Sequence, residues 1–101
     1  IEETKKLLEV DIEVKDEDII IYDEYRFGGY AVISKEVVDV MKYVARKEGI
    51  ILDPVYTAKA MYGLIDLVKK GIIEKGSIVA FIHTGGTPIV FQKAEEIVKH
   101  F

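Results

Sequence analysis

A short, uninterrupted apolar stretch at residues 77–82 limits the possible folds more than any other feature of the chain. It follows the turn residues 74–76 and has the length of a strand buried on both faces, as in a parallel sheet covered by helices. Such a strand needs a hydrogen-bonded neighbour on each edge. The other strand-like stretches, residues 10–14, 19–22 and 50–52, are few and short. We therefore predict that the sequence is a piece of a larger α/β protein.

Two amphipathic helices are predicted in the middle of the chain. Ser34 is a suitable N-cap for a helix that ends at Gly49. Thr57 can cap a second helix over residues 58–70. Their predicted inward faces carry Val37, Val40, Met41 and Val44 in the first helix and Ala60, Met61, Leu64, Leu67 and Val68 in the second.

The predicted order of elements, with shorter helices over residues 2–9 and 93–101, indicates α/β packing with at least one parallel crossover. At 101 residues the chain has room for one small domain. No apolar run reaches the roughly 18–20 residues of a membrane span, and Ile1 opens the chain without a leader or an initiator Met. We therefore expect neither a membrane partner nor secretion.

Residue usage restricts the partners and the site chemistry. The chain has no cysteine, which excludes disulfides, thiolate zinc sites and cysteine nucleophiles, and which leads us to expect a cytoplasmic protein. The net charge of −4 is scattered along the chain, so no basic stripe is available for nucleic acid. The absence of Asn and the abundance of Lys, Glu and Ile favour a thermophilic source.

Two segments depart from ordinary helix and strand patterns. Residues 53–57 precede the second predicted helix, and residues 83–88 follow the buried apolar run. Parallel α/β sheets bind ligands at the carboxyl ends of strands and at helix N-termini, where free backbone N–H groups attract anions. Both segments are therefore candidate sites. The alternative is a structural role, as helix cap and turn in the first segment and as a tight connection in the second.

A few side chains are candidates for binding or catalysis. Tyr30, after a double glycine, and Tyr56, before a helix, lie on predicted loops where an exposed phenol can meet a ligand. Lys59 could form a Schiff base in a desolvated pocket, but a solvated surface lysine is the expectation. His83 and His100 lack the partners of a metal site, so no metal is expected.

Two stretches carry a resemblance to a known family. Residues 48–61 (EGIILDPVYTAKAM) and residues 81–88 (FIHTGGTP) closely resemble the C-terminal part of the D-cysteine desulfhydrase and 1-aminocyclopropane-1-carboxylate (ACC) deaminase family. The likeness runs from about Tyr25 to Phe91. These are pyridoxal-phosphate enzymes of the tryptophan synthase beta-subunit fold, and full members are several-fold longer.

The resemblance implies a fold, a cofactor and partners. The fold would be the C-terminal part of a three-layer α/β enzyme (fold type II), an open twisted sheet flanked by helices. The cofactor would be pyridoxal 5'-phosphate, the substrate a small amino acid, and the assembly a homodimer. The lysine that holds the cofactor, the phosphate-binding loop and the substrate-carboxylate site would lie in an upstream segment, so residues 1–101 alone would be inactive.

By position, the resemblance also implies the site residues. Tyr30 and Tyr56 look like the two active-site tyrosines that face the substrate. Thr84 looks like the residue that bonds the pyridine nitrogen of the cofactor. Gly85 and Gly86, without a Cβ, would let the backbone approach the ring.

Threonines at positions 57 and 84 separate two branches of this family. Deaminases that resemble the chain carry Glu at the first position and an apolar residue at the second, whereas desulfhydrases carry Thr at both, as here. A carboxylate against the pyridine nitrogen makes a strong electron sink, while a hydroxyl leaves a weaker one. Thr57 and Thr84 thus favour β-elimination of D-cysteine to sulfide, pyruvate and ammonia, with ring opening of ACC to 2-oxobutanoate and ammonia as the alternative.

Two further alternatives stay open. Ala31 and Ala58 each replace a glycine that is usual in the family, which narrows the pocket region slightly, so the substrate can differ from D-cysteine. The chain can also be a non-catalytic binding or assembly domain, because none of its lysines has structural support as the attachment point of the cofactor.

Overall fold

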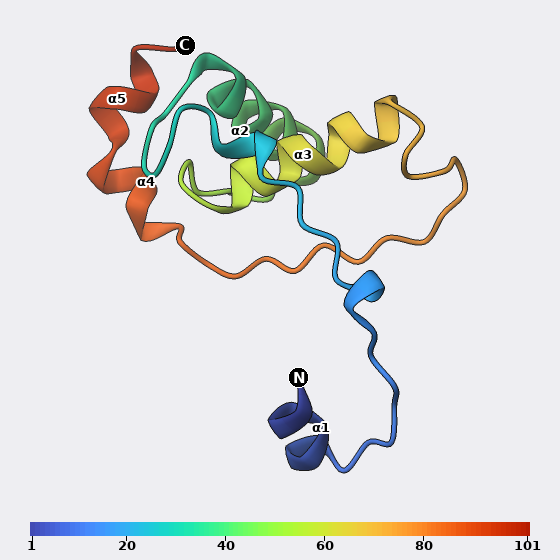
Figure 1. The fold of residues 1–101 in the computed structure, drawn as a ribbon. Helices are drawn as coiled ribbons and strands as arrows, with labels where there is room; N and C mark the ends of the chain where they lie inside the picture. Colours follow the sequence, from blue (N-terminus) through green and yellow to red (C-terminus); the bar gives the residue numbers. More distant parts are fainter.

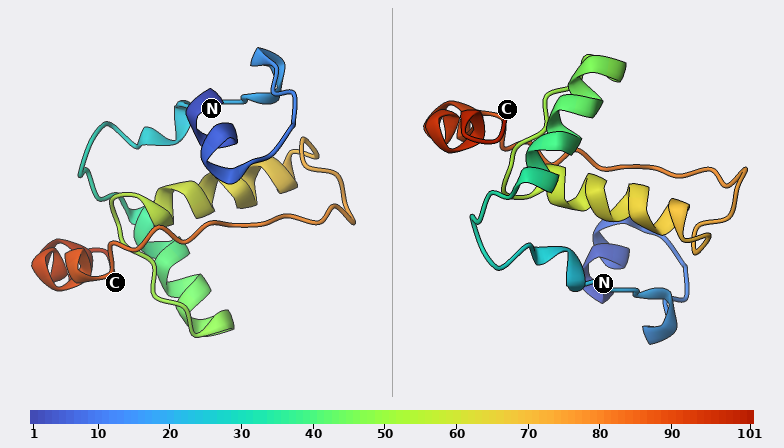
Figure 2. Two further views of the ribbon diagram at one scale, coloured as in Figure 1. Left: turned by 90° about the horizontal axis from the view of Figure 1, so that it is seen from below. Right: turned by 90° about the horizontal axis from the view of Figure 1, so that it is seen from above.

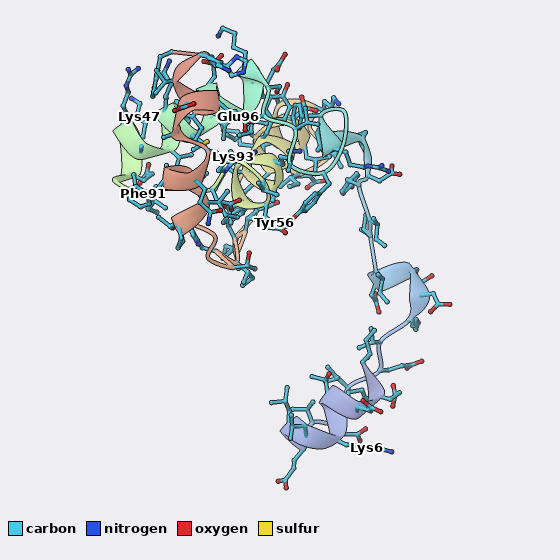
Figure 3. All side chains as sticks on the ribbon, turned by 90° about the vertical axis from the view of Figure 1, so that its left-hand side faces the viewer. Lys6, Lys47, Tyr56, Phe91, Lys93 and Glu96 are labelled. Carbon is cyan, nitrogen blue, oxygen red and sulfur yellow. The ribbon has the colours of Figure 1, made fainter.

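The computed structural model describes all 101 residues and contains only helical elements. Two long helices, α2 and α3, cross at the centre, and the N-terminal segment projects away from them (Figure 1). The side-chain view in Figure 3 shows the same separation of the N-terminal segment from the rest. The elements, in chain order, are α1 (Glu2–Leu8), the 3₁₀ turns η1 (Asp16–Asp18) and η2 (Glu24–Arg26), α2 (Lys35–Glu48), α3 (Thr57–Lys69), α4 (Pro88–Gln92) and α5 (Ala94–Val98). None of these helices is long and apolar enough to cross a membrane.

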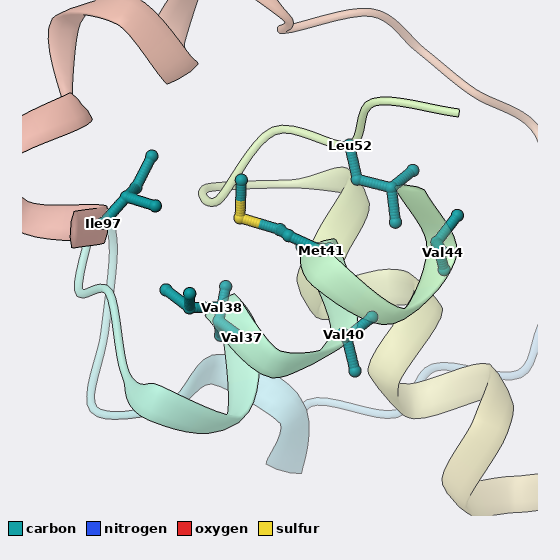
Figure 4. Packing of buried hydrophobic residues seen from close by; sticks show 8 residues of the cluster. Val37, Val38, Val40, Met41, Val44, Leu52 and Ile97 are labelled. Carbon is teal, nitrogen blue, oxygen red and sulfur yellow. The ribbon is translucent and has the colours of Figure 1, made fainter. Parts of the chain in front are cut away.

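The core lies between α2 and the segments that pack on it. The predicted bounds of α2 are confirmed, because Ser34 occupies the N-cap position and Gly49 ends the helix with a φ of 69° in the left-handed region. The Ser34 hydroxyl, however, makes no capping hydrogen bond. The predicted inward stripe is buried, as the close-up in Figure 4 shows. The buried cluster comprises Val37, Val38, Val40, Met41, Val44, Leu52, Ala58 and Ile97.

The predicted inward face of α3 is correct only in part. Leu67 is buried, but Ala60 and Val68 are exposed. Met61 packs on the α2 cluster as predicted, but its neighbours there are Tyr62 and Ile65, because α3 crosses α2 on that side. The prediction assumed one covered stripe, whereas the second apolar face of α3 is uncovered and borders an open hollow of about 400 Å³.

The predicted sheet is not confirmed, since the structure contains no strand. Residues 77–82 return along α3 as an extended segment (Figure 2), and Ile78 there is fully exposed. Residues 10–14, 19–22 and 50–52 are likewise unpaired. The physical reason is a lack of neighbouring strands, which the sequence already indicated. Extended backbone forms a sheet only when another strand supplies N–H and C=O groups to pair with it.

The C-terminal helix is also divided differently from the prediction. Instead of one helix over residues 93–101, α4 begins at Pro88 and α5 follows after a break at Lys93. Pro88 is favourable at the first helical position because its missing N–H would be unpaired there. The buried Ile97 of α5 packs against the α2 cluster, so the break allows this short helix to close the core.

Candidate active site

The Asp53 carboxylate organises the start of α3. It is fully buried, and its Oδ2 accepts the N–H groups of Val55 and Tyr56, each at 2.8 Å. Its Oδ1 accepts the N–H of Thr57 at 2.9 Å and the hydroxyl of Thr57 at 2.6 Å. The Thr57 hydroxyl in turn accepts the N–H of Asp53 at 2.8 Å. Asp53, rather than Thr57, therefore caps this helix.

The ionised state of Asp53 is favoured by this arrangement. Burial raises the pKa of the carboxyl group, but the hydrogen bonds from Thr57 and from three backbone N–H groups outweigh it, and the net pKa lies below the usual value. The carboxylate thus occupies the end of the helix where an anionic ligand was expected. The N–H groups of Tyr56, Thr57 and Ala58 are satisfied by Asp53, so they are not free to hold a phosphate.

Tyr30 and Tyr56 come together although 26 residues separate them. Their hydroxyl oxygens lie 3.0 Å apart, and their ring centroids are 6.1 Å apart at an interplanar angle of 59°. Both rings are exposed, Tyr30 by 80% and Tyr56 by 51%, and they border a hollow of about 300 Å³. The pair leaves one phenol proton free for a ligand. The hydrogen bond with Tyr30 raises the pKa of Tyr56, so Tyr56 stays protonated at neutral pH.

The segment that carries Tyr30 is docked on α3 from one side by Tyr25. The ring of Tyr25 covers Gly63, where an added Cβ would lie 2.9 Å from Cδ2 of the ring. Its hydroxyl donates to Oδ2 of Asp66 at 2.8 Å, and Asp66 also pairs with Lys70. The glycine in α3 therefore allows η2 to approach the helix closely.

Lys59 is not the solvated surface lysine that the sequence led us to expect. Lys59 is only 8% exposed, and its Nζ donates to the carbonyl oxygens of Arg26 at 2.9 Å and Gly29 at 2.8 Å. Burial lowers the pKa of its ammonium group. Its contacts therefore hold the turn that precedes Tyr30.

The second candidate segment, residues 83–88, lies against the first. The backbone of Gly86 approaches Asp53 so closely that an added Cβ would lie 2.7 Å from Cγ of the carboxylate. The His83 ring links the two segments as well. Its Nδ1 accepts the N–H of Gly85 at 3.1 Å, so Nε2 carries the proton and donates to the carbonyl of Ile51 at 3.0 Å.

The structure thus brings together segments that the sequence proposed separately. Thr84 is exposed on the loop that packs on Asp53, and Gly85 faces open space, with no atom within 4 Å of an added Cβ. Thr57 is buried with its hydroxyl engaged by Asp53. Sequence reasoning missed Lys59 and Asp53 as organising residues. The Asp-Pro pair ahead of a helix was a signal for the second of these, whereas nothing local indicated the first.

Comparisons with known proteins identify the family. A family model described as pyridoxal-phosphate dependent enzyme matches residues 2–85. The chain belongs to the pyridoxal-phosphate-dependent enzyme family. Its cofactor is accordingly pyridoxal phosphate. An open backbone face at Gly85, where no Cβ would meet an atom, fits a planar ring, while the N–H groups of Tyr56 and Thr57 are bonded to Asp53 and are not available for the phosphate.

Individual members of the pyridoxal-phosphate-dependent family show high similarity over short parts of their length. A Pyrococcus abyssi protein named "Putative 1-aminocyclopropane-1-carboxylate deaminase" is 50% identical over 98% of this chain. A Bradyrhizobium sp. (strain BTAi1) 1-aminocyclopropane-1-carboxylate deaminase is 41% identical over 89% of it. The chain spans 28% and 26% of these two relatives.

A solved structure matches the whole arrangement described above. It is the crystal structure of an ACC deaminase homologue, which matches 99% of this chain with a TM-score of 0.80 and 44% sequence identity. The chain covers 29% of that protein. The crossing helices and their connections therefore have the fold of one section of a larger pyridoxal-phosphate-dependent enzyme.

Proposed function

We propose that residues 1–101 are the C-terminal part of a pyridoxal-phosphate-dependent carbon–sulfur lyase of the D-cysteine desulfhydrase type. The overall reaction converts D-cysteine and water to sulfide, pyruvate and ammonia. The observation that carries the proposal is the Tyr30–Tyr56 pair, with hydroxyl oxygens 3.0 Å apart beside a hollow on the molecular surface. A volume of about 300 Å³ suits this hollow to a small amino acid.

The two phenols have a chemical role in this proposal. Bound pyridoxal phosphate supplies the electron sink for bond cleavage in the substrate. Because one phenol donates to the other, a single O–H remains to donate to a substrate atom. A departing thiolate sulfur is an acceptor of the required kind. Tyr30 and Tyr56 would thus bind the substrate and stabilise its leaving group.

The threonines support the desulfhydrase branch. We propose that Thr84, exposed on its loop, bonds the pyridine nitrogen, with Gly85 beside the ring. The proton of the Thr57 hydroxyl is committed to Asp53, so toward the cofactor Thr57 could only accept a hydrogen bond. Neither residue offers the carboxylate that keeps a pyridine nitrogen protonated, and a weaker sink is sufficient to expel thiolate.

ACC deaminase is the second candidate, favoured by the names of the relatives. In that case the enzyme would open the cyclopropane ring of ACC and release 2-oxobutanoate and ammonia. The two candidates share the fold, the cofactor and the tyrosine pair. They differ in the residue expected at position 57, which is Thr in this chain.

Catalysis would require more of the polypeptide than residues 1–101. The chain spans 28% and 26% of the two relatives described above, and its one buried lysine, Lys59, has its Nζ bonded to two backbone carbonyls. We therefore propose that the chain is inactive alone, that the lysine holding the cofactor lies upstream, and that the complete enzyme is a homodimer. A non-catalytic role for the isolated segment is compatible with the same observations.

The variant Thr57→Glu, made in the full-length protein, tests the choice between the two activities. We expect the ratio of ACC turnover to D-cysteine turnover to rise by about tenfold or more, because a carboxylate there strengthens the electron sink. The measurement compares 2-oxobutanoate with pyruvate plus sulfide for each enzyme.

Thr57→Gln is the matched control, since it has the size of Glu without the charge. Both substitutions remove the hydroxyl from the Asp53 network, so their shared effects report on packing. An unchanged ratio in a soluble, cofactor-loaded Thr57→Glu enzyme would show that position 57 does not determine the reaction.

A further inference from the structure

Lys59 is a buried cation whose two hydrogen-bond partners are uncharged. It lies in the first turn of α3, three residues after Tyr56. Its Nζ donates to the carbonyl oxygens of Arg26 and Gly29 at 2.9 and 2.8 Å. Burial of an ammonium group is costly unless its N–H groups find acceptors, and here the acceptors are two backbone carbonyls. The two hydrogen bonds therefore hold these carbonyls in place.

The turn that Lys59 holds has an unfavourable backbone. Phe27, Gly28 and Gly29 all have positive φ values, of 52°, 87° and 139°. Ala31, directly after Tyr30, also has a φ of 57°. Non-glycine residues pay a conformational cost in this region. The segment therefore depends on tertiary contacts to keep this shape.

The contacts on Tyr30 itself are few. Its ring is 80% exposed, and its hydroxyl bonds only to Tyr56. Tyr25 docks the preceding residues on α3, but it lies before the positive-φ turn. Lys59 is thus the polar contact that joins the end of the turn, at Gly29, to the same helix start that presents Tyr56.

We propose that Lys59 is a positioning residue that sets the distance between the phenols of Tyr30 and Tyr56. The start of α3 then presents both Tyr56, at the N-cap, and Lys59, which holds the segment of Tyr30. In this role Lys59 acts through Tyr30; the residue also borders the hollow beside the tyrosine pair, but its Nζ is engaged by the two backbone carbonyls. The inference rests on the proposed function only for the expected effect on catalysis. The hydrogen bonds from Lys59 to the turn before Tyr30 are contacts within the chain and do not depend on that function.

The test uses Lys59→Met in the full-length, cofactor-loaded protein, with Lys69→Met as the matched control. Lys69 lies on the same helix and is exposed. Photo-oxidative coupling joins two tyrosines only when their rings are close, and the Tyr30–Tyr56 peptide pair is quantified by mass spectrometry. We expect Lys59→Met to lower the yield of this pair by about fivefold or more, with Lys69→Met unchanged.

Turnover provides the second readout. We expect Lys59→Met to lower kcat for D-cysteine elimination by about 10²-fold with a smaller change in KM and an unchanged cofactor absorbance, because displacement of a reacting group by about 1 Å has this effect. Lys59→Arg restores two or more N–H donors and should recover part of the coupling yield.

The outcomes separate the two proposals. Undiminished coupling in Lys59→Met would overturn the positioning role, whatever the activity. Lost coupling in a protein that never releases sulfide from D-cysteine would support the positioning role and reject the proposed function. If Lys59→Met does not fold, Lys59→Gln, with one side-chain N–H₂ donor group, must show an intermediate loss, and a wild-type yield in that variant would overturn the role as well.

Discussion

Tyr56→Phe, in the full-length holoenzyme, is expected to lower kcat for sulfide release from D-cysteine by about 10²–10⁴-fold, the range for loss of a positioned proton donor. The substitution removes one oxygen of the pair and leaves the ring in place. The cofactor absorbance should be unchanged. Tyr43→Phe is the matched control, since Tyr43 is exposed on α2 away from the pair, and it should retain wild-type activity.

The hydrogen bond between Tyr30 and Tyr56 also predicts how activity depends on pH. The hydrogen bond with Tyr30 raises the pKa of Tyr56, so its removal in Tyr30→Phe lowers that pKa. If protonated Tyr56 is the active form, activity is lost as the pH rises through its pKa. The alkaline limb of kcat/KM should then move to lower pH in Tyr30→Phe than in the wild type. An unmoved limb, or a Tyr56→Phe enzyme with near-normal kcat, would contradict the role given to the pair.

Asp53→Ala is expected to lower the free energy of unfolding by about 3 kcal/mol, since hydrogen bonds to a charged group contribute about 1.5–3 kcal/mol and helix caps about 0.5–2 kcal/mol. The buried carboxylate accepts three backbone N–H groups and the Thr57 hydroxyl, all of which lose their partner. The contact with Gly86 is lost too, so the loop bearing Thr84 should loosen. Urea denaturation of the full-length protein measures the change.

Acid should abolish the contribution of Asp53. Because the folded-state pKa is depressed, the stabilisation is present above the unfolded value of about 3.9 and is lost as the pH falls through the folded value. The difference in stability between wild type and Asp53→Ala should therefore shrink at low pH. Asp11→Ala, at an exposed position, is the control. A difference that stays constant with pH would mean that the charge of Asp53 does not stabilise the fold.

Local patterns predicted the central helix well. The stripe of α2, its start at Ser34 and its stop at Gly49 are all set by residues close in sequence, and the structure confirms these positions, although the Ser34 side chain makes no capping hydrogen bond. The apolar stretch at 77–82 could not be predicted in the same way, because pairing depends on strands that this chain does not supply. The requirement for such neighbours was nevertheless visible in the sequence.

Contacts across the chain escaped prediction in the site. Tyr30 and Tyr56 were predicted as loop residues, but periodicity gives no sign that they share a hydrogen bond across 26 residues. The sequence around Lys59 predicts an ordinary lysine on a helix surface, because nothing local indicates that the positive-φ turn covers it. Thr57 was assigned the cap that Asp53 provides, because both residue types are good caps and lie four positions apart.

The most direct measurement is product analysis of the full-length holoenzyme with D-cysteine and with ACC in parallel. We predict sulfide, pyruvate and ammonia from D-cysteine, with little 2-oxobutanoate from ACC, because Thr57 and Thr84 provide no carboxylate for the pyridine nitrogen. Release of 2-oxobutanoate from ACC without sulfide from D-cysteine would contradict the proposal and would assign the tyrosine pair to ring opening instead.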